Sequence, residues 1–274
     1  MKSWIQNRRV GFVPTMGFLH EGHLALVRRA KKENDAVVVS IFVNPTQFGP
    51  KEDFGKYPRN LKKDLAFLKK ERVDAVFVPS VSDLYPDGVK ATVKAGPLSK
   101  PLEGKFRPGH FDGVCTVVAK LFDVVRPSRA YFGQKDFQQC LVIKEMVDRL
   151  KLPVKIVVCP TVREKDGLAL SSRNVYLSPQ ERTMAPVLHQ TLLQAKKDLH
   201  AGENPRNVEK TAATVLTLMG FKVQYFSIAD AETLAPIVNA ALKKKVNGKR
   251  RPVVIAAAAY FGKTRLIDNV LFRA

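Results

Sequence analysis

The sequence predicts an α/β protein in which a Rossmann-like domain on a parallel sheet is followed by a smaller α+β domain. From Arg9 to about Val158, short β-branched runs alternate with amphipathic stretches. The strand-like runs are continuously apolar, which is typical of a parallel sheet covered by helices on both faces. After Thr161 this alternation stops, and helix-like stretches are followed by strand-like ones. We therefore predict domains at residues 1–161 and 162–274.

The first domain contains a regular alternation of predicted strands and helices. The strands are Val10–Val13, Ala36–Val43, Asp74–Pro79, Ala130–Phe132 and Val154–Val158, and the helices between them include Leu24–Glu33, Asn60–Lys70, Val114–Val125 and Leu141–Leu150. Ligands of doubly wound parallel sheets bind outside the carboxyl ends of the strands. Polar turns that directly follow a strand are therefore the first candidates for a functional site.

The second domain begins with a helix-start pattern. Ser178 is a predicted N-cap, Pro179 fits the first helical position, and Glu181 completes a capping box. A second helix is predicted from Asn204 to Met219. Two strands follow at Phe221–Ala229 and Pro252–Phe261, connected by Ala231–Val238 and the basic segment Lys243–Arg251.

Composition limits the class of protein. The 274 residues are 45% hydrophobic and 26% charged, as in ordinary globular proteins, but the net charge is +21 and favours anionic partners. The apolar run Val253–Phe261 is about half as long as a membrane helix requires. The N-terminal MKSWIQNRRVGF lacks the apolar core of a secretory signal. Cys115, Cys140 and Cys159 lack metal-binding spacing, so we expect buried thiols in a cytoplasmic protein with no membrane association.

Two histidines directly follow the first predicted strand, in PTMGFLHEGHLALVRRA. His20 and His23 are three residues apart, whereas the zinc-protease pattern requires a spacing of four. One interpretation is a pair of capping or surface histidines. The other is that both lie at a helix N-terminus, where free N–H groups and the helix dipole favour a phosphate. Gly17 and Gly22 would allow the phosphate to approach the backbone closely.

Other polar turns have comparable double interpretations. Each fits either an ordinary surface turn or a contact with a nucleotide or a carboxylate. These turns contain Asn44 with Gln47, Arg107–Phe111, Gly133 with Lys135 and Asp136, and Asp166–Asn174. In the last of them, Ser171-Ser172-Arg173 suits a phosphate. Several of these turns follow strands that should end at one edge of one sheet, which favours a shared site. Gly262-Lys263-Thr264 resembles the end of a P-loop, but Ala257 stands where the first glycine is required, so we expect Gly262 only to end a strand.

Taken together, these motifs resemble a known family. His20-Glu21-Gly22-His23 after PTMG, with a downstream Ser-Ser-Arg loop, is similar to the HIGH-type nucleotidyltransferase superfamily. The segments VPTMGFLHEGH, FVNPTQFGPKEDFGKYPR, RPGHFDGV, YFGQKDFQQ, DGLALSSRN and GKTRLIDN resemble the pantoate–β-alanine ligase (pantothenate synthetase) family in order from Val13 to Asn269.

The resemblance implies an ATP-dependent, AMP-forming ligase of the coenzyme A pathway. Pantoate's carboxylate would attack the α-phosphate of ATP to give pantoyl adenylate and pyrophosphate. The amine of β-alanine would then displace AMP to give pantothenate. Mg²⁺ would accompany ATP and offset the phosphate charge. We expect a cytoplasmic homodimer, with no specific nucleic acid or membrane partner.

The resemblance also implies roles for individual residues. His23, His20 and Lys135 would be catalytic, with His23 the proposed proton donor and Lys135 on phosphate, while Gln47 would bind pantoate and β-alanine, Gln139 would bind pantoate, and Asp64 would reach Mg²⁺ through water. ATP would be bound by Met16, Gly17, Phe18, Leu19, His20, Glu21, Gly22, His23, Gly133, Gln134, Lys135, Asp136, Val162, Leu170, Ser171, Ser172 and Arg173, with Asp136 on the ribose and Leu170–Arg173 closing over the phosphates. The family usually has Glu in place of Gln134 and Met in place of Leu170.

Two alternatives remain open from the residues alone. One is a different HIGH-type nucleotidyltransferase, which would transfer AMP or CMP to a phosphate-bearing acceptor. The other is a nucleic-acid-binding protein, suggested by the basic run Lys243–Arg251. That run lacks the interleaved aromatic residues that stacking platforms require, which favours a solvated loop.

Overall fold

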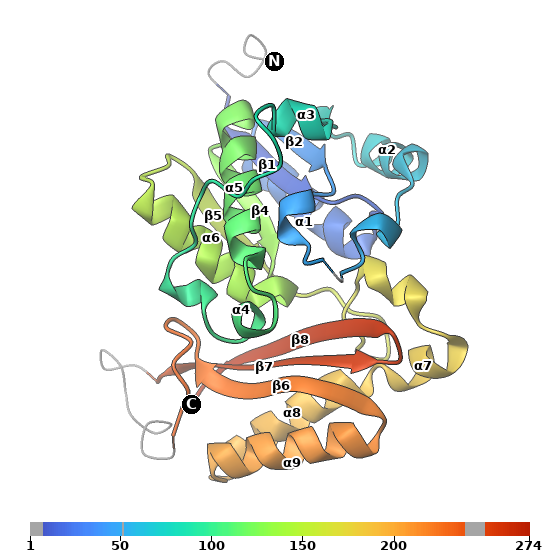
Figure 1. Cartoon of the computed structure of the whole chain (residues 1–274), viewed down its shortest axis with the longest axis vertical. Helices are drawn as coiled ribbons and strands as arrows, with labels where there is room; N and C mark the ends of the chain where they lie inside the picture. Colours follow the sequence, from blue (N-terminus) through green and yellow to red (C-terminus); the bar gives the residue numbers. More distant parts are fainter. Residues whose placement is uncertain (1–7, 51, 239–249) are drawn as a thin grey trace. The chain divides into compact units, whose positions relative to one another are not determined.

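The structure is a computed structural model that describes residues 8–50, 52–238 and 250–274 (Figure 1). The chain forms two compact units, Met1–Val162 and Arg163–Ala274. No helix of the described residues is long and apolar enough to cross a membrane.

The first unit is built on a five-stranded parallel sheet with the strand order β3-β2-β1-β4-β5. The strands are β1 (Val10–Thr15), β2 (Ala36–Ile41), β3 (Ala75–Phe77), β4 (Arg129–Gly133) and β5 (Lys155–Cys159). The predicted α/β class with a parallel sheet is confirmed. β2 is shorter than predicted because Asn44 and Pro45 start a turn soon after Ile41.

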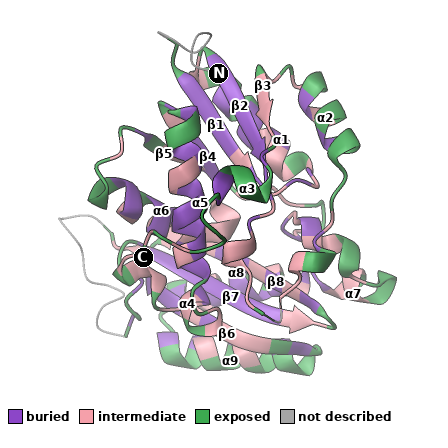
Figure 2. Cartoon of the chain, turned by 45° about the horizontal axis from the view of Figure 1, so that its top comes forward, coloured by how far each residue is buried: buried purple, intermediate pink, exposed green. Residues whose placement is uncertain are grey.

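Helices cover both faces of this sheet. The first unit contains α1 (Glu21–Glu33), α2 (Leu61–Lys70), α3 (Val81–Leu84), α4 (Glu103–Phe106), α5 (His110–Val125) and α6 (Phe137–Arg149), with 3₁₀ turns at Pro45–Gln47, Phe54–Lys56, Pro97–Ser99 and Gln134–Asp136. On one face, Phe12 and Phe132 pack in a core with residues of α5 and α6. On the other, Val13 and Tyr131 pack in a core with residues of α1 and α2. Figure 2 shows the central strands as the buried layer.

The strand order places a topological switch between β1 and β4. The chain runs from β1 outward through β2 to β3, returns to β4 on the other side of β1, and continues to β5. Connections on the two sides of a switch diverge and leave a crevice at the carboxyl ends of the two central strands. The segments that follow β1 and β4 are therefore the ones the fold brings to its ligand-binding edge.

The second unit combines helices with a three-stranded antiparallel sheet of order β6-β7-β8. Its elements are a 3₁₀ turn at Ser172–Tyr176, α7 (Pro179–Met184), α8 (Val187–His200), α9 (Pro205–Leu218), β6 (Phe221–Asp230), β7 (Pro252–Phe261) and β8 (Thr264–Arg273). The Ser178 capping box is confirmed, and Gly262 does end β7, in a turn to β8 at φ +54°. Sequence analysis had not predicted α8 or β8. Of the basic run, Lys243–Lys249 lies outside the described residues.

Gly113 of α5 gives the first testable prediction. A Cβ atom there would lie 2.2 Å from the carbonyl oxygen of Thr46, in the turn that carries Gln47. Glycine-to-alanine changes within helices usually stabilise, but here we expect Gly113→Ala to lower the free energy of unfolding by about 2 kcal/mol. Urea denaturation measures the change. The control is Gly55→Ala, because a Cβ at Gly55 meets no atom within 4 Å; equal stability of the two variants would contradict the prediction.

Candidate active site

The histidine motif forms the connection between β1 and α1 at the switch point. After β1 ends at Thr15, Gly17 and Phe18 take left-handed conformations with φ of +81° and +51°. Glycine tolerates this region freely, but a phenylalanine does so only when its surroundings hold it there. The chain then reaches His20, which is the N-cap of α1. Both histidines thus lie in the first turn of α1, where the sequence predicted a helix start.

Asp64 of α2 holds this connection in place. Its carboxylate accepts hydrogen bonds from the backbone N–H groups of Phe18 and Leu19, at 2.8 and 2.7 Å. The side chain is buried, and hydrogen bonds to a buried charged acceptor are among the stronger ones in proteins. The two bonds offset the backbone strain at Phe18. The water-mediated contact of Asp64 with Mg²⁺ stays a prediction.

The two histidine rings cap α1 reciprocally. The Nδ1 atom of His20 accepts a hydrogen bond from the N–H of Gly22 at 3.2 Å, and Nδ1 of His23 accepts one from the N–H of His20 at 3.3 Å. The capping interpretation is therefore confirmed. The phosphate-site interpretation stays a prediction. Four N–H groups at this connection, those of Phe18, Leu19, His20 and Gly22, already donate to Asp64 or to the imidazoles.

The capping geometry fixes the protonation state of both rings. An Nδ1 that accepts an N–H bond carries no proton, so each neutral ring carries its proton on Nε2. Burial and the Lys135 charge lower the pKa of His20 to about 4. Burial, then His20 and Lys135, lower the pKa of His23 well below its usual value. Both histidines are neutral hydrogen-bond donors at neutral pH.

Lys135 and Asp136 reach the same edge from β4. They form the 3₁₀ turn Gln134–Asp136 between β4 and α6. Their charges act on the His20 pKa in opposite directions, Lys135 lowering it and Asp136 raising it, so the structure brings both residues into the electrostatic field of the histidines. A Cβ at Gly133 would meet no atom within 4 Å, which leaves room for a ligand beside the backbone. Gln139 lies in the first turn of α6.

Gln47 lies in the turn after β2, and the neighbouring Asn44 supports it. Asn44 is 1% exposed, accepts a hydrogen bond from the Tyr85 hydroxyl at 2.6 Å and donates to the Gln47 side chain at 3.1 Å. Asn44 is thus a turn residue, as one of its two interpretations predicted, but it is buried and does not lie at the surface. The Gln47 amide also donates to the Met16 sulfur at 3.0 Å, which links this turn to the segment after β1.

The remaining predicted ATP contacts lie further along the chain. Val162 ends the first unit, and Leu170–Arg173 belongs to the second. Within the second unit, the Ser171 hydroxyl accepts the N–H of Arg173 at 3.3 Å and caps a 3₁₀ turn. Arg163 forms a two-pronged ion pair with the buried Asp268 of β8, at 2.6 and 2.9 Å, and ties the start of this loop to the sheet.

Several residues that hold the predicted site segments in place could not be predicted from the sequence. Arg163 and Asp268 gave no local signal, since they are far apart in sequence. Glu52 pairs with Arg107 through two hydrogen bonds of 2.7 and 2.6 Å, and Nδ1 of His110 donates to the Gln47 carbonyl at 2.8 Å. The sequence predicts the Arg107–Phe111 turn as a surface turn or a ligand contact, and does not predict its bonds to Glu52 and to the Gln47 backbone. The spacing of Arg107 and His110 could have indicated a shared contact.

The part of the chain that the structure describes contains no cluster of three or more His, Cys, Asp or Glu side chains suited to a metal ion. The predicted buried thiols are confirmed, since Cys115, Cys140 and Cys159 are all buried and free. Burial raises the pKa of Cys115 to about 12 and also raises that of Cys140, so neither thiol is a reactive nucleophile.

The histidines predict a specific dependence of stability on pH. Burial and Arg107 lower the pKa of His110 to about 4, like that of His20. Between about pH 6.5 and 4 the unfolded chain binds more protons at these groups than the folded protein. The contribution of His20 and His110 to the free energy of unfolding is therefore complete above pH 6.5. It is lost as the pH falls, by about 1 kcal/mol per pH unit for each histidine. Urea denaturation at pH 7 and 5 tests this, and His110→Asn should lose less over the same interval; a stability independent of pH would contradict it.

The fold and the site together define a class of protein. A doubly wound parallel sheet carries paired histidines after its first strand and a Gly-Gln-Lys-Asp turn after its fourth, both at the switch point. This arrangement is typical of α/β nucleotide-binding enzymes, in which the ligand lies at the carboxyl ends of the central strands.

Comparisons with known proteins then define the family. The family model described as pantoate-beta-alanine ligase matches residues 1–271. Pantothenate synthetases from Fervidobacterium nodosum and Thermotoga neapolitana are 52% and 53% identical over 269 residues, which is 97% of this chain and 92% of each relative. The chain belongs to the pantoate–β-alanine ligase family, as the motifs indicated.

Solved structures agree. The chain matches a pantothenate synthetase from Thermus thermophilus with a TM-score of 0.87 and 49% identity, over 96% of this chain and 92% of that one. It matches the pantoate–β-alanine ligase of Francisella tularensis, solved in complex with a βγ-ATP ligand and β-alanine, with a TM-score of 0.78 and 38% identity, over 98% and 92% of the two chains.

Proposed function

We propose that this chain condenses pantoate with β-alanine in an ATP-dependent reaction, and that the reaction takes place at the carboxyl edge of β1 and β4. Membership of the ligase family supports the activity. The observation that best supports this location is the parallel pairing of β1 with β4, which brings the segments after both strands to one edge of the sheet. The Lys135 charge, which lowers the pKa of both histidines, agrees with it.

The first step would form pantoyl adenylate. A pantoate carboxylate oxygen attacks the α-phosphorus of ATP, the bond from that phosphorus to the bridging oxygen breaks, and pyrophosphate leaves. Lys135 supplies a positive charge and the two histidines supply Nε2–H donors for the phosphate oxygens. In the free protein His23 is neutral, so it stabilises phosphate charge by hydrogen bonding, which we favour over its alternative role as a proton donor. Met16–His23 and Gly133–Asp136 would hold ATP, with Asp136 on the ribose.

The second step would form the amide bond. The uncharged amine of β-alanine attacks the acyl carbon, the amine loses a proton, and AMP leaves with the electrons of the broken acyl–phosphate bond. Gln47 and Gln139 would hold pantoate through its carboxylate and hydroxyls, with Gln47 also bordering β-alanine. Such chemistry depends on positioning and electrostatics and needs no covalent intermediate with the enzyme.

Further parts of the proposal concern groups that act with this site. Mg²⁺ would enter with the ATP phosphates, which usually supply most of its ligands besides water, with Asp64 reaching its water shell. Val162 would contact adenine, and Leu170–Arg173 would close over the phosphates as the second domain, residues 162–274, moves onto ATP. We further propose that the protein is a cytoplasmic homodimer without a specific nucleic-acid partner. The pairing of Arg251 with Asp230 at 2.7 Å, at the end of the basic run, supports the last point.

The experiment that tests the function uses ATP, Mg²⁺, pantoate and β-alanine, with AMP and pantothenate as the measured products. We expect equal amounts of both. Without β-alanine, we expect exchange of labelled pyrophosphate into ATP that depends on pantoate. Exchange that requires a different acid, or transfer of AMP or CMP to a phosphate-bearing acceptor, would contradict the proposal and favour another HIGH-type nucleotidyltransferase.

A further inference from the structure

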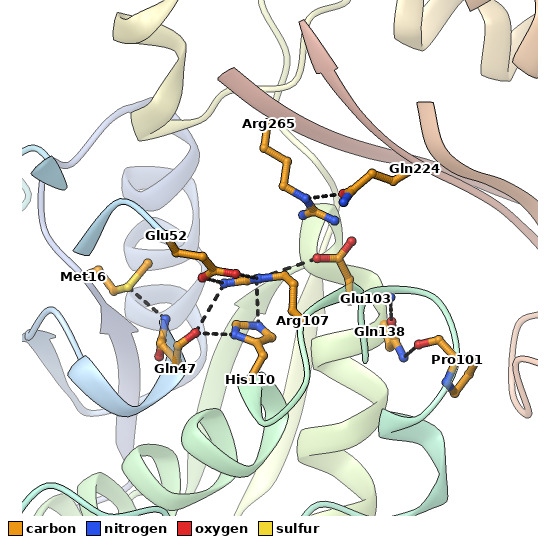
Figure 3. A network of polar contacts seen from close by, with 10 residues as sticks. All are labelled: Met16, Gln47, Glu52, Pro101, Glu103, Arg107, His110, Gln138, Gln224 and Arg265. Carbon is orange, nitrogen blue, oxygen red and sulfur yellow. Dashed lines mark hydrogen bonds and ion pairs between the residues drawn. The ribbon is translucent and has the colours of Figure 1, made fainter. Parts of the chain in front are cut away.

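A cluster of three polar side chains lies behind Gln47, at a place the proposed reaction does not use. We name it the Arg107 cluster: Glu52, Arg107 and His110 (Figure 3). Arg107 donates to both carboxylate oxygens of Glu52, at 2.7 and 2.6 Å, and contacts His110 at 3.1 Å. The Arg107 and Glu52 side chains are 16% and 25% exposed, so this ion pair is shielded from water more than an ordinary surface pair.

The geometry assigns the tautomer of His110. Nε2 faces a guanidinium, which can only donate, so Nε2 must accept and carries no proton. The proton is therefore on Nδ1, which donates to the backbone carbonyl of Gln47 at 2.8 Å. Arg107 also donates to this carbonyl at 3.4 Å. His110 is buried and starts α5, whose position is fixed by the core. The cluster thus connects a rigid helix to the backbone of the predicted pantoate ligand Gln47.

A second set of contacts leads from the Arg107 cluster to α6. Glu103 lies 3.7 Å from Arg107, and its backbone N–H donates to the side chain of Gln138 at 2.9 Å. The Gln138 amide nitrogen also donates to the carbonyls of Leu98 and Pro101, at 2.9 and 2.7 Å, so both its amide oxygen and its amide nitrogen form hydrogen bonds. Gln138 is the sequence neighbour of Gln139. The network therefore contacts the backbone of Gln47 directly and holds Gln138, the residue before Gln139, at the start of α6.

We propose that His110 and Arg107 are positioning residues for the pantoate pocket. They fix the backbone of Gln47 relative to α6, and so hold the two glutamines at the separation that a small hydroxy acid requires. This inference rests on the proposed function, because it assumes that Gln47 and Gln139 contact pantoate. The hydrogen bonds described for Glu52, Arg107 and His110 join these residues to one another and to the Gln47 carbonyl, and none goes directly to Met16–His23 or Gly133–Asp136. We therefore expect disturbance of the cluster to affect the binding of pantoate much more than that of ATP.

The test compares two substitutions of one residue. His110→Asn places an amide nitrogen near the position of Nδ1 and keeps the hydrogen bond to the Gln47 carbonyl. His110→Gln places its amide near the position of Nε2 and loses that bond. We expect the KM for pantoate to rise about tenfold in His110→Gln, which corresponds to about 1.4 kcal/mol, and less than threefold in His110→Asn. The KM for ATP should stay within twofold in both.

Three results would overturn the proposal. These are an unchanged KM for pantoate in His110→Gln, equal effects of the two variants, and a parallel rise in the KM for ATP. If His110→Gln fails to fold, Glu52→Gln decides, since it weakens the ion pair of a partly exposed residue: a threefold or larger rise in the KM for pantoate alone supports the proposal, and a smaller one overturns it. Failure of the proposed function differs from all of these, because the wild-type protein would then form no pantothenate.

Discussion

Replacement of His23 by alanine is expected to lower kcat at least a hundredfold while the protein stays folded. His23 is the third residue of α1, and its ring carries its proton on Nε2 because Nδ1 accepts the N–H of His20. The variant loses that Nε2–H donor, and removal of one preorganised donor to developing charge typically costs a hundred- to a thousandfold in rate. Steady-state kinetics of AMP formation measure the loss.

A matched variant separates the catalytic role of His23 from its capping role. His23→Asn keeps an oxygen that can accept the His20 N–H but has no group at the position of Nε2. The same kind of capping bond is present at α3, where Asp83 accepts the N–H of the N-cap residue Ser80. We expect His23→Asn to be as stable as the wild type and as inactive as His23→Ala. The same loss of turnover is expected for Lys135→Ala. Near-wild-type rates in both His23→Ala and Lys135→Ala would show that the site is misplaced.

Replacement of Asp64 by asparagine is expected to lower the free energy of unfolding by about 2–4 kcal/mol. The buried carboxylate accepts two backbone N–H groups, from Phe18 and Leu19. An asparagine amide has a single oxygen, so its NH₂ group must face one of these N–H donors and leave it unsatisfied. The strained conformation of Phe18 then loses its support, and we expect kcat/KM to fall with stability. Urea denaturation and kinetics measure the two effects.

Asp74→Asn is the control for this prediction. Asp74 accepts a single backbone N–H, from Val37 at 2.8 Å, so an asparagine can keep the bond with its oxygen. We expect a loss below about 1 kcal/mol and unchanged kinetics. A different result for Asp64→Asn, with full stability and only a weaker dependence on Mg²⁺, would identify Asp64 as a metal contact and not as the support of the loop.

The sequence could predict the sheet because the apolar runs and the helix spacing are local properties. It also located the polar turns after β1 and β4, since both follow buried strands directly. It could not show that the N–H groups of Phe18, Leu19, His20 and Gly22 already have acceptors. One of the acceptors, Asp64, is separated from Phe18 by the whole of α1, β2 and the turns that follow, and no spacing rule connects the two residues.

The substrates and the protonation states at the site follow from different observations. The names of the acid and the amine came from the family motifs, since no local pattern distinguishes pantoate from another hydroxy acid. The protonation states of His20, His23 and His110 came only from the structure, because each follows from a particular N–H or guanidinium donor. The strand β8 was not predicted although TRLIDNVLFR alternates partly, since Gly262 was interpreted as the end of a strand and GKTRLIDN only as a family motif.

The central claim is that this site forms an acyl adenylate of pantoate, and transfer of oxygen tests it most directly. Pantoate with ¹⁸O in its carboxylate is incubated with the protein, ATP, Mg²⁺ and β-alanine, and the products are analysed by mass spectrometry. Attack of a carboxylate oxygen on the α-phosphorus predicts one ¹⁸O atom in AMP, one in pantothenate, and none in pyrophosphate. AMP without label, or label in pyrophosphate or phosphate, would contradict the account.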